Sequence, residues 1–500
     1  MAIKDFFKFG KKKKLKRSYE GANTTRFLSD FIQQSRSADD EIRYSLRQLR
    51  DRTRELHRNN EYAKRFVNLM VTNIIGNQGM TLQNRAKDGN NELDFVANSV
   101  IESRWKEWSK FGNCTTDQKM SFHDSLKMVV QSLFIDGEVL VQMVKDKSNR
   151  YLFAMKFLDI DLLDEEKNEV LQNGNTIRMG VELEKDTDKP VAYHLFEYNP
   201  YDYFIGTPKS KQTIRVPADN ILHIYFMERP NQTRGVPPMS PTIKNFKMLH
   251  GYLEAELVAS RIHASQMGFI TSPSGDEYIG DVAPENEYTQ QMKIEAGTFQ
   301  QLPAGHDIKT FSPEHPTSAF DTFVKNQINT RQAALGQISS GLNISYHSLA
   351  NDLTQVNYSS IRQGELEQRE YFKTMQKFIV DHFCKPIYGE WLKMAMTSTE
   401  MNLPMAKYDK FNTPNFQPKG FPWIDPLKEI QANIQGLKNG IVSVSDIASN
   451  YGKDTETLFE QIQADKKLAE KFGLDYMFEP FGMAMKDNDN VENREEEDGN

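Results

Sequence analysis

Apolar residues at helical spacing mark two long helices on either side of an irregular segment. The first stripe comprises Phe246, Leu249, Leu253 and Leu257. The second comprises Phe320, Val324, Ile328 and Leu335, with Arg331 at the same spacing, and Gly336 follows it. Steps of three and four predict helices over residues 243–267, closed by Gly268, and over 316–336, ended by Gly336. Short strand-like runs between them (269–270, 292–294, 298–302 and 308–311) predict a small insert.

A polar segment, residues 337–359, separates the second helix from one that restarts at Ser359 or Ser360. Loops of this length are usually functional or disordered. Apolar residues at intervals favour an anchored loop; they are Leu342, Ile344, Tyr346, Leu349, Leu353 and Val356. The near absence of Lys and Arg suits a surface that passes phosphate groups without holding them.

The region before the first long helix has helices followed by strands. We predict helices over 38–70 (capped by Asp39 or Asp40), 94–108 and 122–134. The second should turn Phe95, Val100, Ile101, Trp105 and Trp108 inward. We predict strands over 139–144, 151–158, 177–183, 190–198 and 221–226. This order predicts an α+β region.

The later part of the chain is mainly helical. Residues 360–396 predict one long helix that Pro386 kinks, and a Pro- and Asn-rich connection follows over 397–421. A helix from Pro426 should end at Lys438-Asn439-Gly440, with Ser445 capping the next. Its apolar face comprises Leu427, Ile430, Ile434 and Leu437.

Composition limits the classes of protein to which the chain can belong. Its 500 residues, 38% hydrophobic and 26% charged, predict a folded chain of two to four subdomains. We expect no secretory signal and no membrane helix, since no apolar run approaches about 18 residues. Cys114 and Cys384 should be buried thiols. The net charge of -7 argues against a protein that grips DNA tightly.

The two ends differ in charge. Aromatic residues precede a lysine run at Lys11–Lys14. This pattern would suit an anchor at a membrane surface or on nucleic acid, but it favours a disordered basic tail over residues 1–37. Residues 481–500 form an acidic tail that should be disordered.

A search for catalytic motifs is largely negative. The chain has no phosphate-binding Gly-Lys-Ser/Thr loop and no His-Glu-x-x-His, Cys-x-x-Cys or Gly-x-Ser-x-Gly. Asp159, Asp161 and Asp164 could hold Mg²⁺, although the solvated end of a strand is the favoured interpretation. His250 and His263 are too far apart for a metal pair, so structural histidines are expected. We predict no enzyme, no metal and no cofactor.

Several blocks of sequence resemble the lambda-family portal proteins of tailed phages. The strongest are Gly341-Leu342-Asn343-Ile344-Ser345-Tyr346-His347-Ser348-Leu349 and Asn357-Tyr358-Ser359-Ser360-Ile361-Arg362. Others are residues 54–63 (RELHRNNEYA), 73–76 (NIIG), 136–142 (DGEVLVQ), 233–237 (TRGVP) and 423–429 (WIDPLKE). They occur in the expected order from about residue 45 to 465.

The resemblance implies an architecture. Residues 38–240 would be the α+β wing, 241–268 and 316–336 the two stem helices, and 269–315 the small α/β clip. Residues 337–359 would be the channel loop, 360–421 a long kinked helix returning to the wing, and 422–480 the helical crown.

The resemblance also implies a function and partners. The chain would form a dodecameric ring at a capsid vertex of the virion, having been made in the host cytoplasm. Its channel would pass double-stranded DNA, without sequence specificity, during packaging and later ejection. Partners would be the terminase large subunit at the clip, the major capsid and scaffold proteins, and a head-tail adaptor, with no membrane.

Two sets of residues carry these expectations. The DNA-facing residues of the channel loop would be Ser345, Tyr346, His347, Asn351, Asp352, Thr354, Gln355 and Asn357. The stem residues would be Lys247, Leu253, Leu257, Arg261, Phe320, Val324, Ile328 and Arg331.

Elementary geometry agrees with a ring. Twelve helices at ~10 Å spacing trace a circle ~38 Å across, and side chains of helices ~10–12 Å wide leave a bore of roughly 25–28 Å. B-form DNA, about 20 Å wide, passes such a bore. Two alternatives remain open: a metal-dependent phage DNA-processing enzyme that uses the aspartate cluster, and a capsid or scaffold subunit without a channel.

Overall fold

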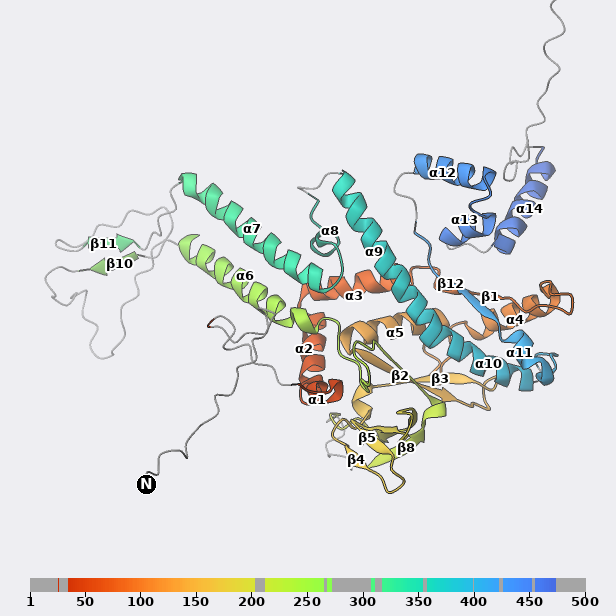
Figure 1. Ribbon diagram of the computed structural model, residues 1–500. Helices are drawn as coiled ribbons and strands as arrows, with labels where there is room; N and C mark the ends of the chain where they lie inside the picture. The colour runs from red at the N-terminus through yellow and green to blue at the C-terminus, as the bar shows by residue number, and fades with distance from the viewer. Residues whose placement is uncertain are drawn as a thin grey trace, which may run out of the picture.

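A broad body and a projecting pair of helices make up the protein (Figure 1). The computed structural model describes Arg26 and residues 35–202, 212–264, 268–271, 307–310, 317–353, 358–398, 400–421, 426–451 and 455–473. Helices and strands are mixed in the body, which confirms the predicted α+β character at this coarse level.

The first predicted helix is three helices: α1 (Ala38–Ile42), α2 (Leu46–Asn59) and α3 (Glu61–Ile74). Asn60 has an extended backbone, and its side chain accepts hydrogen bonds from the amides of Tyr62 and Ala63, so it caps α3. The predicted cap of α1 was wrong, because the Ser37 side chain accepts from the Asp40 amide.

Helices α4 (Phe95–Trp108) and α5 (Phe122–Ile135) match their predictions closely. Asp94 caps α4, and Ser121 forms a capping box with Asp124 at the start of α5. The expected inward face of α4 was wrong at Phe95 and Val100, which are exposed. Trp105 and Trp108 are buried, and both rings pack against Phe122 and Trp391.

Two antiparallel sheets follow. The first has the order β3-β2-β9, from β2 (Glu138–Val144), β3 (Ala154–Leu158) and β9 (Ile221–Tyr225). The second runs in sequence order through β4 (Glu169–Val170), β5 (Thr176–Arg178), β6 (Val181–Leu183), β7 (Pro190–Phe196) and β8 (Thr213–Pro217). Short 3-10 helices occur at Ile160–Leu162, Ala218–Asn220, Ser240–Thr242 and Met405–Lys407. Strand β8 was not predicted.

A further strand pair joins distant parts of the chain. Strand β1 (Thr81–Asn84) pairs with β12 (Pro414–Gln417), which lies after the short helix α11 (Tyr408–Phe411). The predicted connection over 397–421 therefore contains a helix and a strand. Its strand returns the chain to β1 in the body.

The projecting pair consists of α6 (Ile243–Ala264) and α7 (Thr317–Gly341), and a two-stranded sheet of β10 (Gly268–Thr271) and β11 (Asp307–Thr310) lies beyond it (Figure 1). Gly268 begins a strand, so it is not a helix stop.

The predicted end of the second helix at Gly336 was also wrong, since α7 continues for five residues. Glycine costs only about 1 kcal/mol inside a helix, so packing of Leu335 and Ile338 overrides it. The predicted runs 292–294 and 298–302 lie outside the described residues.

The long helix of the body contains a π-helical turn. It runs as α9 (Tyr358–Ile379), the turn (Val380–Cys384) and α10 (Lys385–Thr397). Within the turn, the Lys385 amide donates to the Val380 carbonyl, five residues back. Pro386 lacks an amide hydrogen and crowds the carbonyl four residues earlier, so the hydrogen-bond ladder shifts by one residue just before it. The irregularity expected at Pro386 therefore takes the form of a π-turn.

Three helices form the predicted crown: α12 (Pro426–Lys438), α13 (Val444–Asn450) and α14 (Thr455–Lys471). Gly440 has a φ of +68°, consistent with the predicted stop. The predicted cap Ser445 was wrong, because Ser443 caps α13 through a capping box with Asp446.

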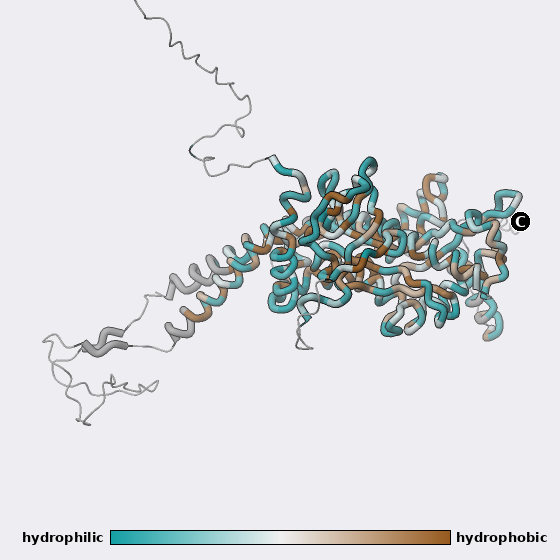
Figure 2. The backbone as a smooth tube through the Cα atoms, turned by 90° about the horizontal axis from the view of Figure 1, so that it is seen from below, coloured by the Kyte–Doolittle hydropathy of each residue, from teal (hydrophilic) through white to brown (hydrophobic). Residues whose placement is uncertain are grey.

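Apolar residues are concentrated in the body and alternate with hydrophilic ones along the projecting helices (Figure 2). Cys114 and Cys384 are free and buried, as predicted. Among the described helices, none has the length and apolar character needed to cross a bilayer.

The two serines near α13 provide a test of its cap. Ser443→Ala should destabilise α13 by about 1 kcal/mol, because an amide loses its side-chain acceptor. Hydrogen exchange of the α13 amides should then be roughly fivefold faster. Ser445→Ala is the matched control and should leave exchange unchanged; equal acceleration in both variants would contradict this cap assignment.

Candidate functional site

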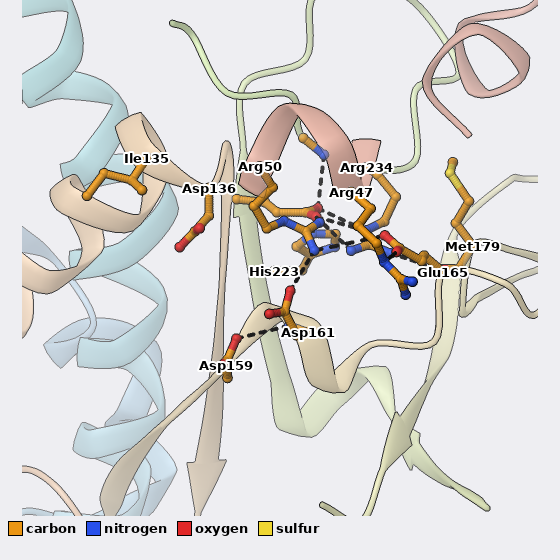
Figure 3. Close-up of polar contacts among 12 residues, drawn as sticks. Arg47, Arg50, Ile135, Asp136, Asp159, Asp161, Glu165, Met179, His223 and Arg234 are labelled. Carbon is orange, nitrogen blue, oxygen red and sulfur yellow. Dashed lines mark hydrogen bonds and ion pairs between the residues drawn. The ribbon is translucent and has the colours of Figure 1, made fainter. Parts of the chain in front are cut away.

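A buried carboxylate, that of Glu138 at the start of β2, contacts the segment that leads into α6. Its Oε1 accepts from Arg50 Nη2 at 3.0 Å and from Arg234 Nη2 at 2.7 Å. Its Oε2 accepts from the Gly235 amide at 2.9 Å and lies 2.9 Å from His223 Nε2. Figure 3 shows Arg50, Arg234 and His223 converging from three different segments.

Two glycines allow the backbone to approach this carboxylate. A Cβ atom on Gly235 would lie 2.2 Å from the Gly137 carbonyl oxygen, which no side chain tolerates. Gly137 itself has a φ of +85°, and a Cβ there would lie 2.4 Å from the Pro237 nitrogen. The blocks Asp136-Gly137-Glu138 and Thr233-Arg234-Gly235 therefore pack directly against each other.

A second layer of charges surrounds the first. Arg54 donates to Asp136 Oδ1 and Asp161 Oδ2, both at 2.6 Å, and Arg50 Nη1 donates to Asp161 Oδ1 at 2.9 Å. Arg47 and Glu165 form a further pair at 2.6 Å. Helix α2 therefore presents Arg47, Arg50 and Arg54 to the carboxylates of this region, and Figure 3 shows the first two.

The three aspartates considered for Mg²⁺ do not form a metal site. Asp161 is held by two arginines, so the expectation that it is solvated was wrong. Asp159 accepts from Asn199, and Asp164 accepts from the amide of Glu166 in its own turn. In the part of the chain that the structure describes, no cluster of three His, Cys, Asp or Glu side chains could hold a metal ion.

The charges of the cluster are fixed by their surroundings. Burial alone would raise the pKa of Glu138, but the charge of Arg234 and the contact with His223 outweigh it, so the pKa is lowered. Burial lowers the pKa of His223 despite its contact with Glu138. The carboxylate is therefore ionised and balanced by guanidinium groups.

The cluster holds the segment that leads into α6. Arg234 and Gly235 lie just before the turn that leads into α6, and Arg234 Nη1 also donates to the Met179 carbonyl at 2.8 Å. Thr233 is held in turn by Asp39, which accepts from its amide and its hydroxyl. The start of α6 is therefore tied to α2, to both sheets and to α1.

The segment predicted to be the channel loop is largely anchored to the body. Leu342, Ile344 and Leu349 are buried, as predicted, and the last of them belongs to a short helix α8 (Tyr346–Ala350). Arg65 on α3 donates to the Ser348 carbonyl at 2.7 Å and to Asn351 Oδ1 at 3.3 Å. The loop is therefore shorter than the predicted 337–359, because α7 extends to Gly341 and α9 begins at Tyr358.

Asp352 joins the loop to the stem. Its Oδ2 accepts from the Tyr346 hydroxyl at 2.9 Å and from Gln332 Nε2, on α7, at 3.3 Å. Burial and the bond to Asp352 raise the pKa of Tyr346 to about 12, so its hydroxyl remains protonated at neutral pH.

The predicted DNA-facing residues fall into three groups. Ser345, Tyr346, His347 and Asp352 are half-buried and hydrogen-bonded within the loop or to α9. Asn351 is exposed, with a left-handed φ of +54°. Thr354, Gln355 and Asn357 lie outside the described residues. Leu353, predicted to be an anchor, is exposed instead.

The predicted stem residues are also divided. Leu253 is half-buried and packs against the core. Lys247, Leu257, Ile328 and Arg331 are exposed, so the expected stripe of contacts between the two helices was wrong at Leu257 and Ile328. Arg261, Phe320 and Val324 belong to the helices, but their side chains lie outside the described residues. His250 is exposed, so it is not a structural core histidine; His263 lies outside the described side chains.

Sequence reasoning missed the Glu138 cluster as a unit. Its parts were noticed only as separate blocks. The available signal was a glycine next to a charged residue in both blocks, since glycine permits the close approach that a buried ion pair needs.

Comparisons with known proteins give a consistent result. The family model described as "Phage portal protein, lambda family" matches residues 24–376. A "Probable portal protein" of Halomonas phage phiHAP-1 is 32% identical over 494 residues, covering 97% of this chain and 92% of that protein. "Portal protein B" of Escherichia phage lambda is 22% identical over 450 residues, covering 82% of this chain and 81% of that protein.

Among solved structures, the chain is similar to one from the structure described as "Virion of native gene transfer agent (GTA) particle". The two share 15% identity with a TM-score of 0.42, and the match covers 80% of this chain and 93% of the other.

Removing the charge of Glu138 should be strongly destabilising. Glu138→Gln leaves Arg50 and Arg234 without their central carboxylate, and breaking a buried pair in this way costs about 3–5 kcal/mol. Chemical denaturation, followed by tryptophan fluorescence, would measure the loss in free energy of unfolding.

The exposed pair between Glu41 and Arg229 supplies the control. Glu41→Gln should change the free energy of unfolding by about 0–1 kcal/mol, as for surface ion pairs. If both variants were as stable as the original protein, the Glu138 cluster would not have the structural role assigned to it.

Proposed function

Because the chain belongs to the lambda family of phage portal proteins, we propose that its copies close into a dodecameric ring at one vertex of the capsid. The ring's channel passes double-stranded DNA during packaging and later ejection. This function needs a subunit that packs side by side with identical copies and presents a weakly charged surface to DNA.

The observation that best supports this proposal is the exposed apolar surface of the stem. Met248, Leu257 and Val258 on α6 are 66%, 63% and 48% exposed, and Ile328 on α7 is 41% exposed. Exposed apolar side chains along a projecting helix pair favour a protein partner. A neighbouring copy supplies one, since head-to-tail contacts that repeat by rotation close into a ring.

The channel loop suits a surface that DNA passes. From Leu342 to Leu353 the loop contains no Lys or Arg, so it offers no cation that would hold phosphate groups. Its base is fixed by Arg65 and Gln332, whereas Leu353, next to Asp352, is exposed.

The partners follow from this arrangement. The terminase large subunit would bind the clip at residues 269–315, and a head-tail adaptor would join the ring after packaging. The major capsid and scaffold proteins would surround the wing. These assignments rest on the family and on the position of β10 and β11 beyond the stem helices (Figure 1).

The two alternative functions have less support. A metal-dependent enzyme would need free carboxylates, whereas Asp161 is bound by Arg50 and Arg54. A capsid or scaffold subunit without a channel would form shells or sheets. Negative-stain electron microscopy of the purified protein tests the proposal, since rings with a central channel are expected and closed shells would overturn it.

A charge on the stem should prevent ring formation. Leu257→Asp would bury an unpaired carboxylate between neighbouring stems, at a cost of several kcal/mol. The fraction of protein in rings, measured by size exclusion and microscopy, should fall by more than about tenfold. Val170→Asp, at an exposed apolar position of β4, is the matched control and should leave rings intact. Full ring recovery with Leu257→Asp would contradict the stem contact.

A cation on the channel loop should slow DNA movement without affecting assembly. Leu353→Lys adds one potential phosphate contact per subunit. Each such contact makes the plot of log binding constant against log salt concentration steeper by about 0.9. Packaging assays with the motor, run at two ionic strengths on rings checked by microscopy, should show slower translocation, most clearly at low salt.

Val170→Lys provides the control for this test, because it adds the same charge on the wing. Unchanged packaging with Leu353→Lys at both ionic strengths would mean that the loop does not face DNA.

A further inference from the structure

A groove of about 420 Å³ lies where the crown meets the long helix of the body. Its walls come from α9, the π-helical turn and α10 on one side, and from residues 414–421 and the end of α13 on the other. Four of its lining residues are lysines: Lys373, Lys377, Lys385 and Lys419. Asp381 is the one acidic residue among its lining residues.

This positive charge is only partly balanced within the described chain. Lys385 pairs with Asp381 at 2.6 Å, and Lys373 pairs with Glu370 at 2.7 Å, but both are exposed pairs that solvent weakens. The ion pairs found at this groove among the described residues are these two, and neither includes Lys377. The groove is thus a cationic site on a chain whose net charge is -7.

Lys419 fixes one wall of the groove. Its Nζ donates to the Thr72 carbonyl at 3.1 Å and to Asn73 Oδ1 at 3.4 Å. Burial and the charge of Arg369 lower its pKa, as expected where cations gather without enough anions. An anionic partner would relieve this repulsion.

The chain itself contains a segment of complementary charge. Residues 486–500 include seven acidic residues and two basic ones, and four of the acidic residues are consecutive at Glu495–Asp498. A run of adjacent carboxylates matches a groove lined by several ammonium groups.

The segment is long enough to reach the groove. Ser449 and Asn450 at the end of α13 line the groove, and α14 begins five residues later at Thr455. Helix α14, at 1.5 Å per residue, is about 25 Å long, and the link from Asn450 spans at most about 17 Å. Gly473 therefore lies within about 50 Å of the groove, whereas 22 extended residues, from Gly473 to Glu495, span about 70 Å.

We propose that residues 486–500 of the same protomer dock in this lysine groove and shield it from other polyanions, above all the phosphates of DNA. This contact belongs to the protomer, so it stands whether or not the ring of the proposed function forms. It also accounts for a cationic groove on a protein that must let DNA pass without holding it.

Zero-length carbodiimide cross-linking of the full-length protein tests the contact. The reagent joins a carboxylate to a lysine amine only when the two touch, and mass spectrometry locates the joined peptides. We expect links between residues 486–500 and Lys373, Lys377, Lys385 or Lys419, and fewer of them at high salt because exposed charges are screened. Mixing ¹⁵N-labelled and unlabelled chains before assembly distinguishes links within one protomer from links between two.

DNA binding gives a second measurement. Deleting residues 486–500 should strengthen binding of a short DNA duplex several-fold at low salt. That gain should vanish when the deletion is combined with Lys373→Gln and Lys377→Gln. The matched control is the deletion with Lys145→Gln and Lys147→Gln, which removes two exposed lysines from the turn after β2 and should retain the gain.

Three results would overturn the proposal. The first is the absence of cross-links to the groove, or equal linking to Lys145 and Lys147. The second is linking only between labelled and unlabelled chains, which would assign the segment to a second copy. The third concerns the double variant Lys373→Gln and Lys377→Gln. If it lost DNA binding equally in the full-length protein and in the protein without residues 486–500, the groove would be a DNA site with no internal occupant.

Discussion

The carboxylate of Glu138 is buried, and this one charge dictates how several distant segments must meet. An ionised carboxylate without partners would cost far more than a folded domain can tolerate. Its partners Arg50 and Arg234 lie 88 and 96 residues away in the chain. Helix α2, strand β2 and the segment that leads into α6 are therefore held together at this carboxylate.

Burial of such a cluster is not an efficient route to stability, because desolvation offsets much of the attraction between the charges. What the cluster supplies is orientation. Arg234 binds Glu138 through two nitrogens and the Met179 carbonyl through a third, so its guanidinium plane fixes the backbone of residues 233–235. Gly137 and Gly235 are required because a side chain at either position would collide with this backbone.

Much of the fold could be predicted from local pattern, and the failures have physical causes. Helix α5 follows from periodicity, because its buried residues recur at steps of three and four. The caps at Ser37 and Ser443 each lie close to another plausible capping residue, and propensity alone could not choose between them. The pairing of β1 with β12, and of Asp161 with two arginines, depends on contacts over more than 100 residues, for which one sequence holds no local signal.

The candidate site was predicted less well than the fold for a related reason. The channel loop was identified by its polarity, yet polar residues such as Ser345, Ser348 and Asp352 use their side chains within the protein. Arg65 ties the loop base to α3, while Gln332 ties Asp352 to α7. Each such hydrogen bond contributes about 0.5–1.5 kcal/mol, so a shift of α7 against α3 must either carry the loop base with it or break one of these bonds. The loop base is therefore mechanically coupled both to α3 in the body and to α7 in the projecting helix pair.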